Sequence, residues 1–159
     1  RGCGVATVLD TSGPPLKAGC AAAPDWVKPN EVEAIELTGC TLEDLRTPRA
    51  RIDVIRAIHD LGPRRVLLSL GERGAVYYDG HEIWLAEAPT ITEVSAVAAG
   101  DAALAGALWA WLKGHSAGEI IRWAVATGTA TAAHDGSGVP PRVNIETIYE
   151  RVQSRCVSA

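Results

Sequence analysis

The residues best suited to chemistry gather in three short stretches, of which the most informative ends in Ala98-Ala99-Gly100-Asp101. A helix rich in small residues is expected to follow these four. Small residues let the backbone approach a ligand, and the unpaired N–H groups at a helix N-terminus bind anions. A carboxylate beside such an anion hole can take a proton from an incoming hydroxyl group. The alternative is that Asp101 only complements the helix dipole, and spacing alone leaves both interpretations open.

The second stretch, Lys28-Pro-Asn-Glu-Val-Glu33, is expected where a strand gives way to a helix. Asn30 and Glu33 could hold a hydrated magnesium ion, which prefers few protein ligands and several waters, and Lys28 could meet a phosphate group. Asn30 and Glu33 also have the spacing of a helix N-cap and its capping-box glutamate. A purely structural capping role therefore stays open.

The third stretch, Ser69-Leu-Gly-Glu-Arg-Gly74, leaves the clearest buried strand of the chain. Ligands bind at the carboxyl ends of strands in open α/β sheets, which makes Ser69, Gly71 and Gly74 candidate ligand contacts. The two glycines could equally make no more than a turn.

Strands and helices that could position these stretches alternate along the chain. Short apolar runs predict strands over 5–9, 26–27, 65–70, 75–78 and 81–86, and a short extended piece over 91–94. Helices are predicted after Pro14 and over 30–37, 48–61, 100–113, 117–133 and 144–152. This alternation predicts an α/β layered fold with a largely parallel sheet, because buried strands in such sheets read as continuous apolar runs.

Composition limits the class of protein. The 159 residues are 47% hydrophobic and 21% charged, as expected of one globular domain over 1–159. The net charge of -4, without a basic stripe, disfavours nucleic acid as a partner. The longest apolar stretch, 102–111, is too short to span a membrane. Four cysteines without CxxC spacing predict reduced thiols in a cytoplasmic protein, and no zinc site is expected.

Motifs of three other enzyme classes are missing. The sequence contains no GxxxxGK[ST] phosphate loop, no GxGxxG following a strand and no GxSxG around a serine. These absences exclude the usual signatures of P-loop NTPases, Rossmann dehydrogenases and serine hydrolases. The chain also lacks methionine and opens almost directly into a strand, which favours a fragment, a processed chain or one half of something larger.

Taken in order, the three stretches resemble the PfkB (ribokinase-like) family of carbohydrate kinases. The family's C-terminal signature ends in Gly-Ala-Gly-Asp or Ala-Ala-Gly-Asp, its Asn-x-x-Glu motif is similar to Asn30 to Glu33, and its nucleotide turn is similar to 69–74. Asp10-Thr-Ser-Gly13 and Lys28-Pro-Asn30 resemble the branch containing 1-phosphofructokinase and tagatose-6-phosphate kinase. That branch usually has threonine where this chain has Ala96.

The resemblance implies a ribokinase-like three-layer α/β/α fold, of which this chain would be the nucleotide-binding C-terminal half. It also implies roles for single residues. Asp101 would deprotonate the acceptor hydroxyl, and the N–H groups of Ala98, Ala99 and Gly100 would stabilise the transferred phosphoryl group. Asn30 and Glu33 would position magnesium and Lys28 the triphosphate of ATP. The nucleotide would be lined by Ser69, Gly71 and Gly74, with the helix over 127–133 and Gly136 and Gly138 near the adenine.

The implied activity is ATP-dependent phosphorylation of a sugar or sugar phosphate, with a phosphorylated hexose or related sugar as acceptor. In the family the N-terminal half carries most sugar contacts and the lid, so that half, or a homodimer partner, is an expected partner. The alternative is a non-catalytic nucleotide-binding fragment of such a kinase. The two differ in whether an upstream partner segment exists, and exposed apolar patches would favour truncation.

Overall fold

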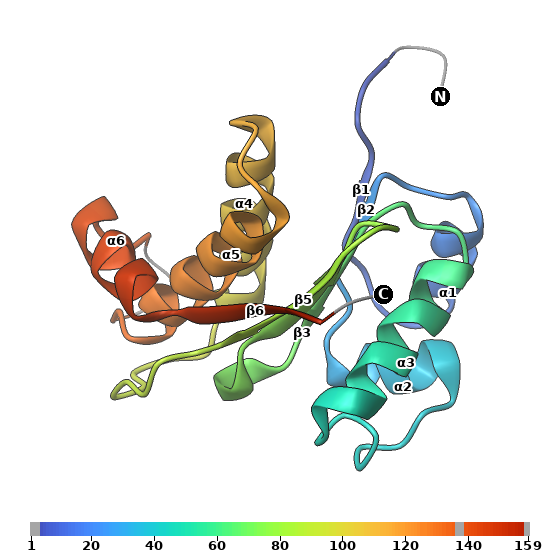
Figure 1. Cartoon of the computed structure of the whole chain (residues 1–159), viewed down its shortest axis with the longest axis horizontal. Coiled ribbons are helices and arrows are strands. Elements are labelled where there is room, and N and C mark those ends of the chain that lie inside the picture. Colours follow the sequence, from blue (N-terminus) through green and yellow to red (C-terminus); the bar gives the residue numbers. More distant parts are fainter. Residues whose placement is uncertain (1–3, 136–138, 158–159) are drawn as a thin grey trace. The chain divides into compact units, whose positions relative to one another are not determined.

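The computed structural model of the chain describes residues 4–135 and 139–157. It comprises two compact units. The first takes in the chain up to Ser69 together with Val76–Ile83, and the second takes in Leu70–Ala75 and the chain from Trp84 onward. Figure 1 shows helices α1–α3 in the first unit and α4–α6 in the second. No helix within the described ranges is long and apolar enough to cross a lipid bilayer.

The first unit builds its sheet from short buried strands and three helices. Its strands follow one another in the order β1, β2, β3, β4. The pairs β1–β2 and β2–β3 are parallel, with Leu9 opposite Val27 and Val27 opposite Val66. Helix α1 contacts β1, and α2 and α3 contact β3 (Figure 1). The bounds are β1 Val8–Leu9, α1 Pro14–Ala21, β2 Trp26–Val27, α2 Glu31–Thr38, α3 Pro48–Asp60, β3 Val66–Ser69 and β4 Ala75–Tyr78.

Local sequence explains where the helices of this unit begin and end. Helix α3 begins after Thr47, whose hydroxyl accepts the Ala50 N–H, and Pro48 occupies its first turn. Its buried face consists of Val54, Ile55 and Ile58, close to the three-residue spacing visible in the sequence. Helix α2 ends at Gly39, where a φ of 73° suits glycine.

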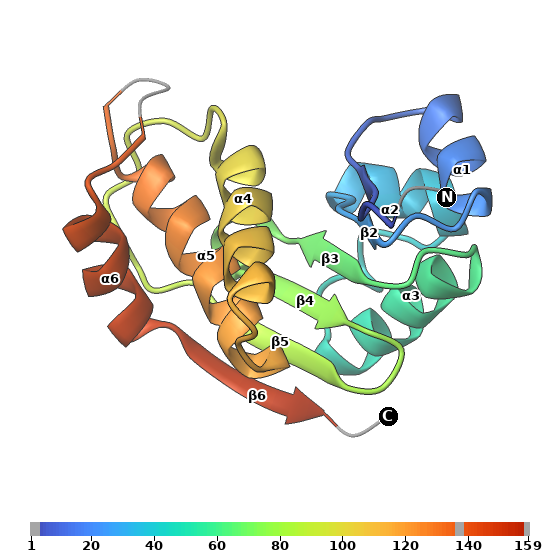
Figure 2. The same cartoon turned by 90° about the horizontal axis from the view of Figure 1, so that it is seen from above.

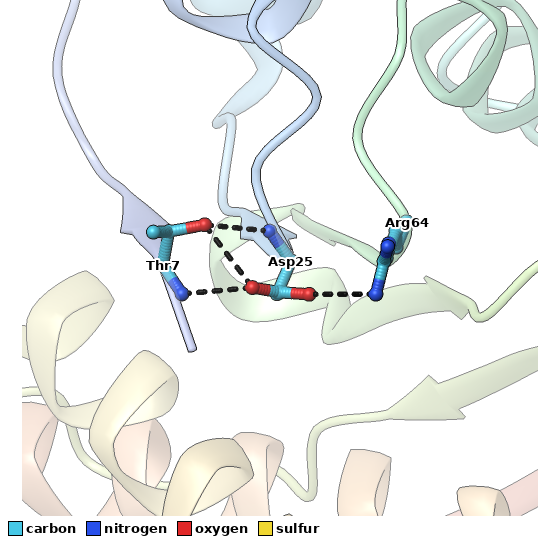
Figure 3. A network of polar contacts seen from close by, with 3 residues as sticks. All are labelled: Thr7, Asp25 and Arg64. Atoms are coloured by element: carbon cyan, nitrogen blue, oxygen red, sulfur yellow. Dashed lines mark hydrogen bonds and ion pairs between the residues drawn. The ribbon is translucent and has the colours of Figure 1, made fainter. Parts of the chain in front are cut away.

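A polar network ties the amino-terminal ends of the first three strands together (Figure 3). The Asp25 carboxylate, just before β2, accepts the Thr7 N–H at 2.9 Å and the Thr7 hydroxyl at 3.1 Å. Its other oxygen lies 3.3 Å from the Arg64 guanidinium, two residues before β3. Because the strands are parallel, their carboxyl ends lie together at the opposite edge of the sheet. The candidate residues Lys28, Asn30 and Ser69 lie at that edge.

The second unit consists mainly of packed helices. Figure 2 shows α4 beside α5 and α6 beyond α5, as their packing contacts also indicate. Strand β6 lies next to β5 in the sheet order and contacts α5. The bounds are the 3-10 turn Gly71–Arg73, β5 Ile83–Glu87, α4 Ala99–Leu112, α5 Ala117–Ala132, α6 Arg142–Arg151 and β6 Gln153–Val157.

Most predicted elements are present, with two differences. The short piece over 91–94 lies outside the strands, and its Val94 N–H donates to the Ala132 carbonyl at 2.8 Å. The first strand is confined to Val8–Leu9, because Asp25 rather than a strand partner binds the Thr7 N–H. Strand β6 was not predicted, because its polar, partly exposed residues follow α6 without a turn signal.

Candidate functional site

Strands β1 and β2 end side by side and place two opposite charges at their carboxyl ends. Asp10 follows Leu9 and Lys28 follows Val27, and the two strand-end residues are opposite each other in the register. The Lys28 N–H donates to the Leu9 carbonyl at 3.3 Å. The Lys28 ammonium lies 3.3 Å from the Asp10 carboxylate, although the lysine side chain is only 7% exposed. The Lys28 ammonium is thus held at the strand end by Asp10, a residue that the sequence did not single out for this role. Its contact with a phosphate group stays a prediction.

The end of β3 is joined to the same edge through Pro29. The Ser69 N–H donates to the Pro29 carbonyl at 3.0 Å, and the Ser69 hydroxyl donates to the same oxygen at 3.4 Å. Lys28, Asn30 and Ser69 are therefore brought together at the carboxyl edge of the first unit, where α/β sheets bind ligands.

Asn30 and Glu33 form the capping box of α2. The Asn30 Oδ1 atom accepts the Glu33 N–H at 3.0 Å, and the Glu33 Oε2 atom accepts the Asn30 N–H at 2.8 Å. The structural interpretation of this spacing is therefore confirmed. The capping box uses one carboxylate oxygen of Glu33 and leaves the other for a ligand. A single carboxylate, together with phosphate oxygens and water, suits magnesium. The residues present fit a hydrated magnesium ion, although no cluster of three metal-ligating side chains occurs within 4–135 or 139–157.

In the second unit, Ala98 is the N-cap residue of α4 and has an unusual backbone conformation. Its φ of 61° and ψ of 2° are left-handed, a region that favours glycine. Ala99 donates to the Ala96 carbonyl at 3.3 Å, whereas the N–H groups of Ala98 and Gly100 have no acceptor within the described part of the chain. The turn therefore presents open amides, with the exposed Asp101 carboxylate in the first turn of the helix. The roles of these residues as anion hole and base stay predictions.

Close packing between α4 and α5 holds this turn in place. A Cβ atom on Gly128 would lie 3.0 Å from the Ala99 carbonyl oxygen, and one on Gly106 would lie 2.7 Å from the Trp123 carbonyl oxygen. Val94 and Ser95, in the segment leading to α4, both donate their N–H groups to the Ala132 carbonyl, at 2.8 and 3.1 Å. Glycine in these helices thus permits the approach that fixes the start of α4.

The glycines of the predicted nucleotide turn have different structural needs. Gly71 has a φ of 58° and open space around it, so only its backbone conformation favours glycine. Gly74 has a φ of 92°, and a Cβ atom there would collide with the Ala86 carbonyl oxygen. Its N–H donates to the Gly71 carbonyl at 3.1 Å. The turn interpretation is confirmed for both residues, and their contact with a nucleotide stays a prediction.

A hollow of about 210 Å³ opens between the end of α5 and α6. Its lining combines apolar and polar side chains: Ala130, Ala133, His134, Asn144, Thr147 and Ile148. Apolar walls with a few polar groups are typical of small-molecule sites. The predicted helix over 127–133 contributes to it, whereas Gly136 and Gly138 lie outside the described residues. Sequence reasoning missed His134, Asn144 and Thr147, because His134 follows the end of α5 and the other two lie on α6, with no shared motif.

Arg122 anchors the helix that forms one wall of this hollow. Its guanidinium donates to the carbonyls of Tyr149 and Val152 at 2.9 and 3.2 Å and stacks over the Tyr149 ring at 4.1 Å. The Trp123 ring also stacks on the Tyr149 ring, with 4.4 Å between the ring centroids. Burial raises the pKa of Tyr149 above its ordinary value. These contacts satisfy the carboxyl end of α6 and fix its position against α5.

Comparison with known proteins identifies the class. The model of the pfkB family carbohydrate kinases matches residues 3–143, and the chain therefore belongs to that family. Among curated relatives, 1-phosphofructokinase of Rhodobacter capsulatus is 38% identical over 149 residues, covering 94% of this chain and 46% of the relative. 1-Phosphofructokinase of Escherichia coli K12 is 32% identical over 148 residues, covering 91% of this chain and 46% of the relative.

Solved structures show the same fold. Phosphofructokinase-2 from Escherichia coli in complex with potassium aligns with a TM-score of 0.84 at 27% identity, covering 93% of this chain and 48% of the other. Ribokinase from Arabidopsis thaliana, complexed with ribose and ATP, aligns with a TM-score of 0.77 at 26% identity, covering 92% and 48%. The ribokinase-like α/β fold is thereby confirmed, and the chain spans about half the length of the relatives that it matches.

Proposed function

We propose that this chain provides the nucleotide-binding part of an ATP-dependent sugar kinase, with Asp101 as the catalytic base. The observation that carries the proposal is the start of α4, where the left-handed Ala98 opens amides beside an exposed carboxylate. Phosphoryl transfer needs positioning and charge stabilisation more than covalent chemistry, and open amides with an adjacent base are suited to both. The pfkB match supports the same chemistry.

Each group has a role in this scheme. Asp101 would accept the proton of the attacking sugar hydroxyl, and the open amides of Ala98 and Gly100 would stabilise the charge on the transferred phosphoryl group. The Ala99 N–H, in contrast to the sequence prediction, already donates to the Ala96 carbonyl. Lys28 would bind a phosphate of ATP at the carboxyl edge of the first unit. Magnesium, when bound, would neutralise phosphate charge, and Asn30 and Glu33 would position it.

The nucleotide base would occupy the hollow between α5 and α6. Its apolar walls suit a purine ring, and Asn144 offers an amide that can both donate and accept hydrogen bonds. Ser69, Gly71 and Gly74 would contact the nucleotide from the turn that follows β3. The acceptor would be a phosphorylated hexose, as the names of the 1-phosphofructokinase relatives suggest.

Turnover would also need the half of the family's domain that this chain does not span. Val5, three residues before β1, and Val8, its first residue, are 74% and 42% exposed. Strand β1 ends the strand order, so its outer backbone groups can pair with a further strand. We propose that the remaining half of the kinase, or a second copy of this chain, covers this edge. The cytoplasm is the proposed setting, where Cys20, Cys40 and Cys156 would remain the free thiols that the structure shows.

A coupled ADP-release assay tests the proposal. The chain is assayed alone and mixed with the N-terminal half of the Rhodobacter capsulatus relative, against fructose 1-phosphate, fructose 6-phosphate, tagatose 6-phosphate and ribose. We expect sugar-dependent ADP release in the mixture, highest with a phosphorylated hexose. Binding of ATP without turnover in every mixture would instead favour a non-catalytic nucleotide-binding fragment, and failure to bind ATP at all would contradict both.

A further inference from the structure

The pair formed by Asp10 and Lys28 is unusual because a nearly buried ammonium faces a partly exposed carboxylate. The Lys28 side chain is 7% exposed and that of Asp10 is 30% exposed, and their charged atoms lie 3.3 Å apart. An unpaired ammonium in such a place would be costly, because little water is left to solvate it. Asp10 therefore supplies the compensation that allows a lysine at this position.

The carboxylate also determines where the ammonium points. A lysine side chain has four rotatable carbon–carbon bonds, and fixing it in one rotamer costs conformational entropy. The backbones of the two residues are already aligned, since the Lys28 N–H donates to the Leu9 carbonyl at 3.3 Å. The ion pair then fixes the far end of the side chain. An ammonium has three N–H donors, so one bond to Asp10 leaves two for a ligand.

The ion pair of Asp10 and Lys28 lies where a ligand is expected. Both residues leave parallel strands at the carboxyl edge, where ligands bind in α/β sheets, and Asn30 at the start of α2 lies two residues beyond Lys28. We propose that Asp10 is a positioning residue that holds the Lys28 ammonium ready for a phosphate group of the nucleotide. This inference rests on the proposed function, which places ATP at this edge.

A direct effect of Asp10 on the ligand would have the opposite sign. A carboxylate that faced the phosphates would repel them, so its removal would tighten binding. If the carboxylate acts through Lys28, its removal would weaken phosphate binding. This loss would occur only in a chain that still has the Lys28 ammonium. The two mechanisms are separated by a double-mutant cycle, which measures the coupling between neighbouring side chains.

The experiment is calorimetric titration of the full chain with inorganic tripolyphosphate and, separately, with magnesium ATP. The variants are Asp10→Asn, Asp10→Glu, Lys28→Met and the double variant Asp10→Asn with Lys28→Met, each checked for folding by thermal unfolding. We expect Asp10→Asn to weaken tripolyphosphate binding about fivefold or more, and Asp10→Glu to restore it to within about twofold. In the Lys28→Met background, Asp10→Asn should change binding by less than about twofold.

Two results would overturn the positioning role while leaving the proposed function intact. One is wild-type binding that Asp10→Asn leaves unchanged or tightens. The other is an equal loss from Asp10→Asn in both backgrounds, which would mean that Asp10 does not act through Lys28. If the wild-type chain binds neither tripolyphosphate nor magnesium ATP, the proposed nucleotide site fails, and the role of Asp10 fails with it.

Discussion

Glu33 allows the capping and magnesium roles of one side chain to be separated. Its Oε2 atom accepts the Asn30 N–H at 2.8 Å, while its charge would serve a bound cation. Glu33→Gln keeps an oxygen that can accept this hydrogen bond but removes the charge. Glu33→Ala removes both. The two variants should therefore differ in stability and agree in their loss of magnesium-dependent binding.

The expected size follows from the geometry of the cap. Losing a carboxylate in the first turn of a helix costs a few tenths of a kcal/mol to about 1 kcal/mol, and Glu33→Gln should stay at the low end because the hydrogen bond persists. Glu33→Ala should cost about 1 kcal/mol, with a fall of about 2–4 °C in Tm for a chain of this size. Magnesium-dependent ATP affinity should fall about tenfold or more in both.

Urea unfolding measures the first quantity, and calorimetric titration of ATP at several magnesium concentrations measures the second. Glu36→Gln is the matched control, because Glu36 is an exposed glutamate on the same helix and its replacement makes the same change in charge. The magnesium role is refuted if Glu33→Gln retains the wild-type magnesium dependence, in which case Glu33 serves only as a cap.

Three further predictions concern stability. Ala98→Gly should raise the free energy of unfolding by up to about 1 kcal/mol, because glycine adopts the φ of 61° without the cost of a side chain; a loss of stability in urea unfolding would argue against strain at Ala98. Gly74→Ala should lower the free energy of unfolding by about 3 kcal/mol through collision with the Ala86 carbonyl. A wild-type midpoint of urea unfolding would show that the turn adjusts. Hydrogen bonds from the Ser116 side chain and N–H lower the pKa of Glu119. The stability that Glu119 contributes to the folded chain is therefore present above its unfolded pKa and is lost as pH falls through its folded pKa. Glu119→Gln should therefore destabilise at neutral pH but not in acid, and an equal loss at both pH values in urea unfolding would contradict this.

Local signals predicted much of the fold and of the candidate site. The capping pair Asn30 and Glu33, the stop at Gly39 and the apolar face of α3 all depend on neighbours a few residues apart, and these features are visible in the sequence. The same holds for the small residues at the start of α4, whereas the left-handed conformation of Ala98 is visible only in the structure.

What the sequence could not supply depends on contacts between distant segments. The ion pair of Asp10 and Lys28 requires the parallel register of β1 and β2. The hollow with His134 and Asn144 requires α6 to be held on α5 by Arg122. Strand β6 gains its conformation from its place in the sheet, because its own residues are polar and lack strong alternation. Neither spacing nor composition encodes these contacts directly.

The most direct measurement compares Asp101→Asn with the wild-type chain in the mixture that supplies the other half of the kinase. Asparagine keeps the size of the side chain at the start of α4 but cannot accept the proton of the sugar hydroxyl. We expect phosphorylation of the sugar phosphate to fall by a factor of about 10²–10⁴, while calorimetry shows ATP affinity within about threefold of wild type. Turnover near the wild-type rate would contradict the assignment of Asp101 as the base.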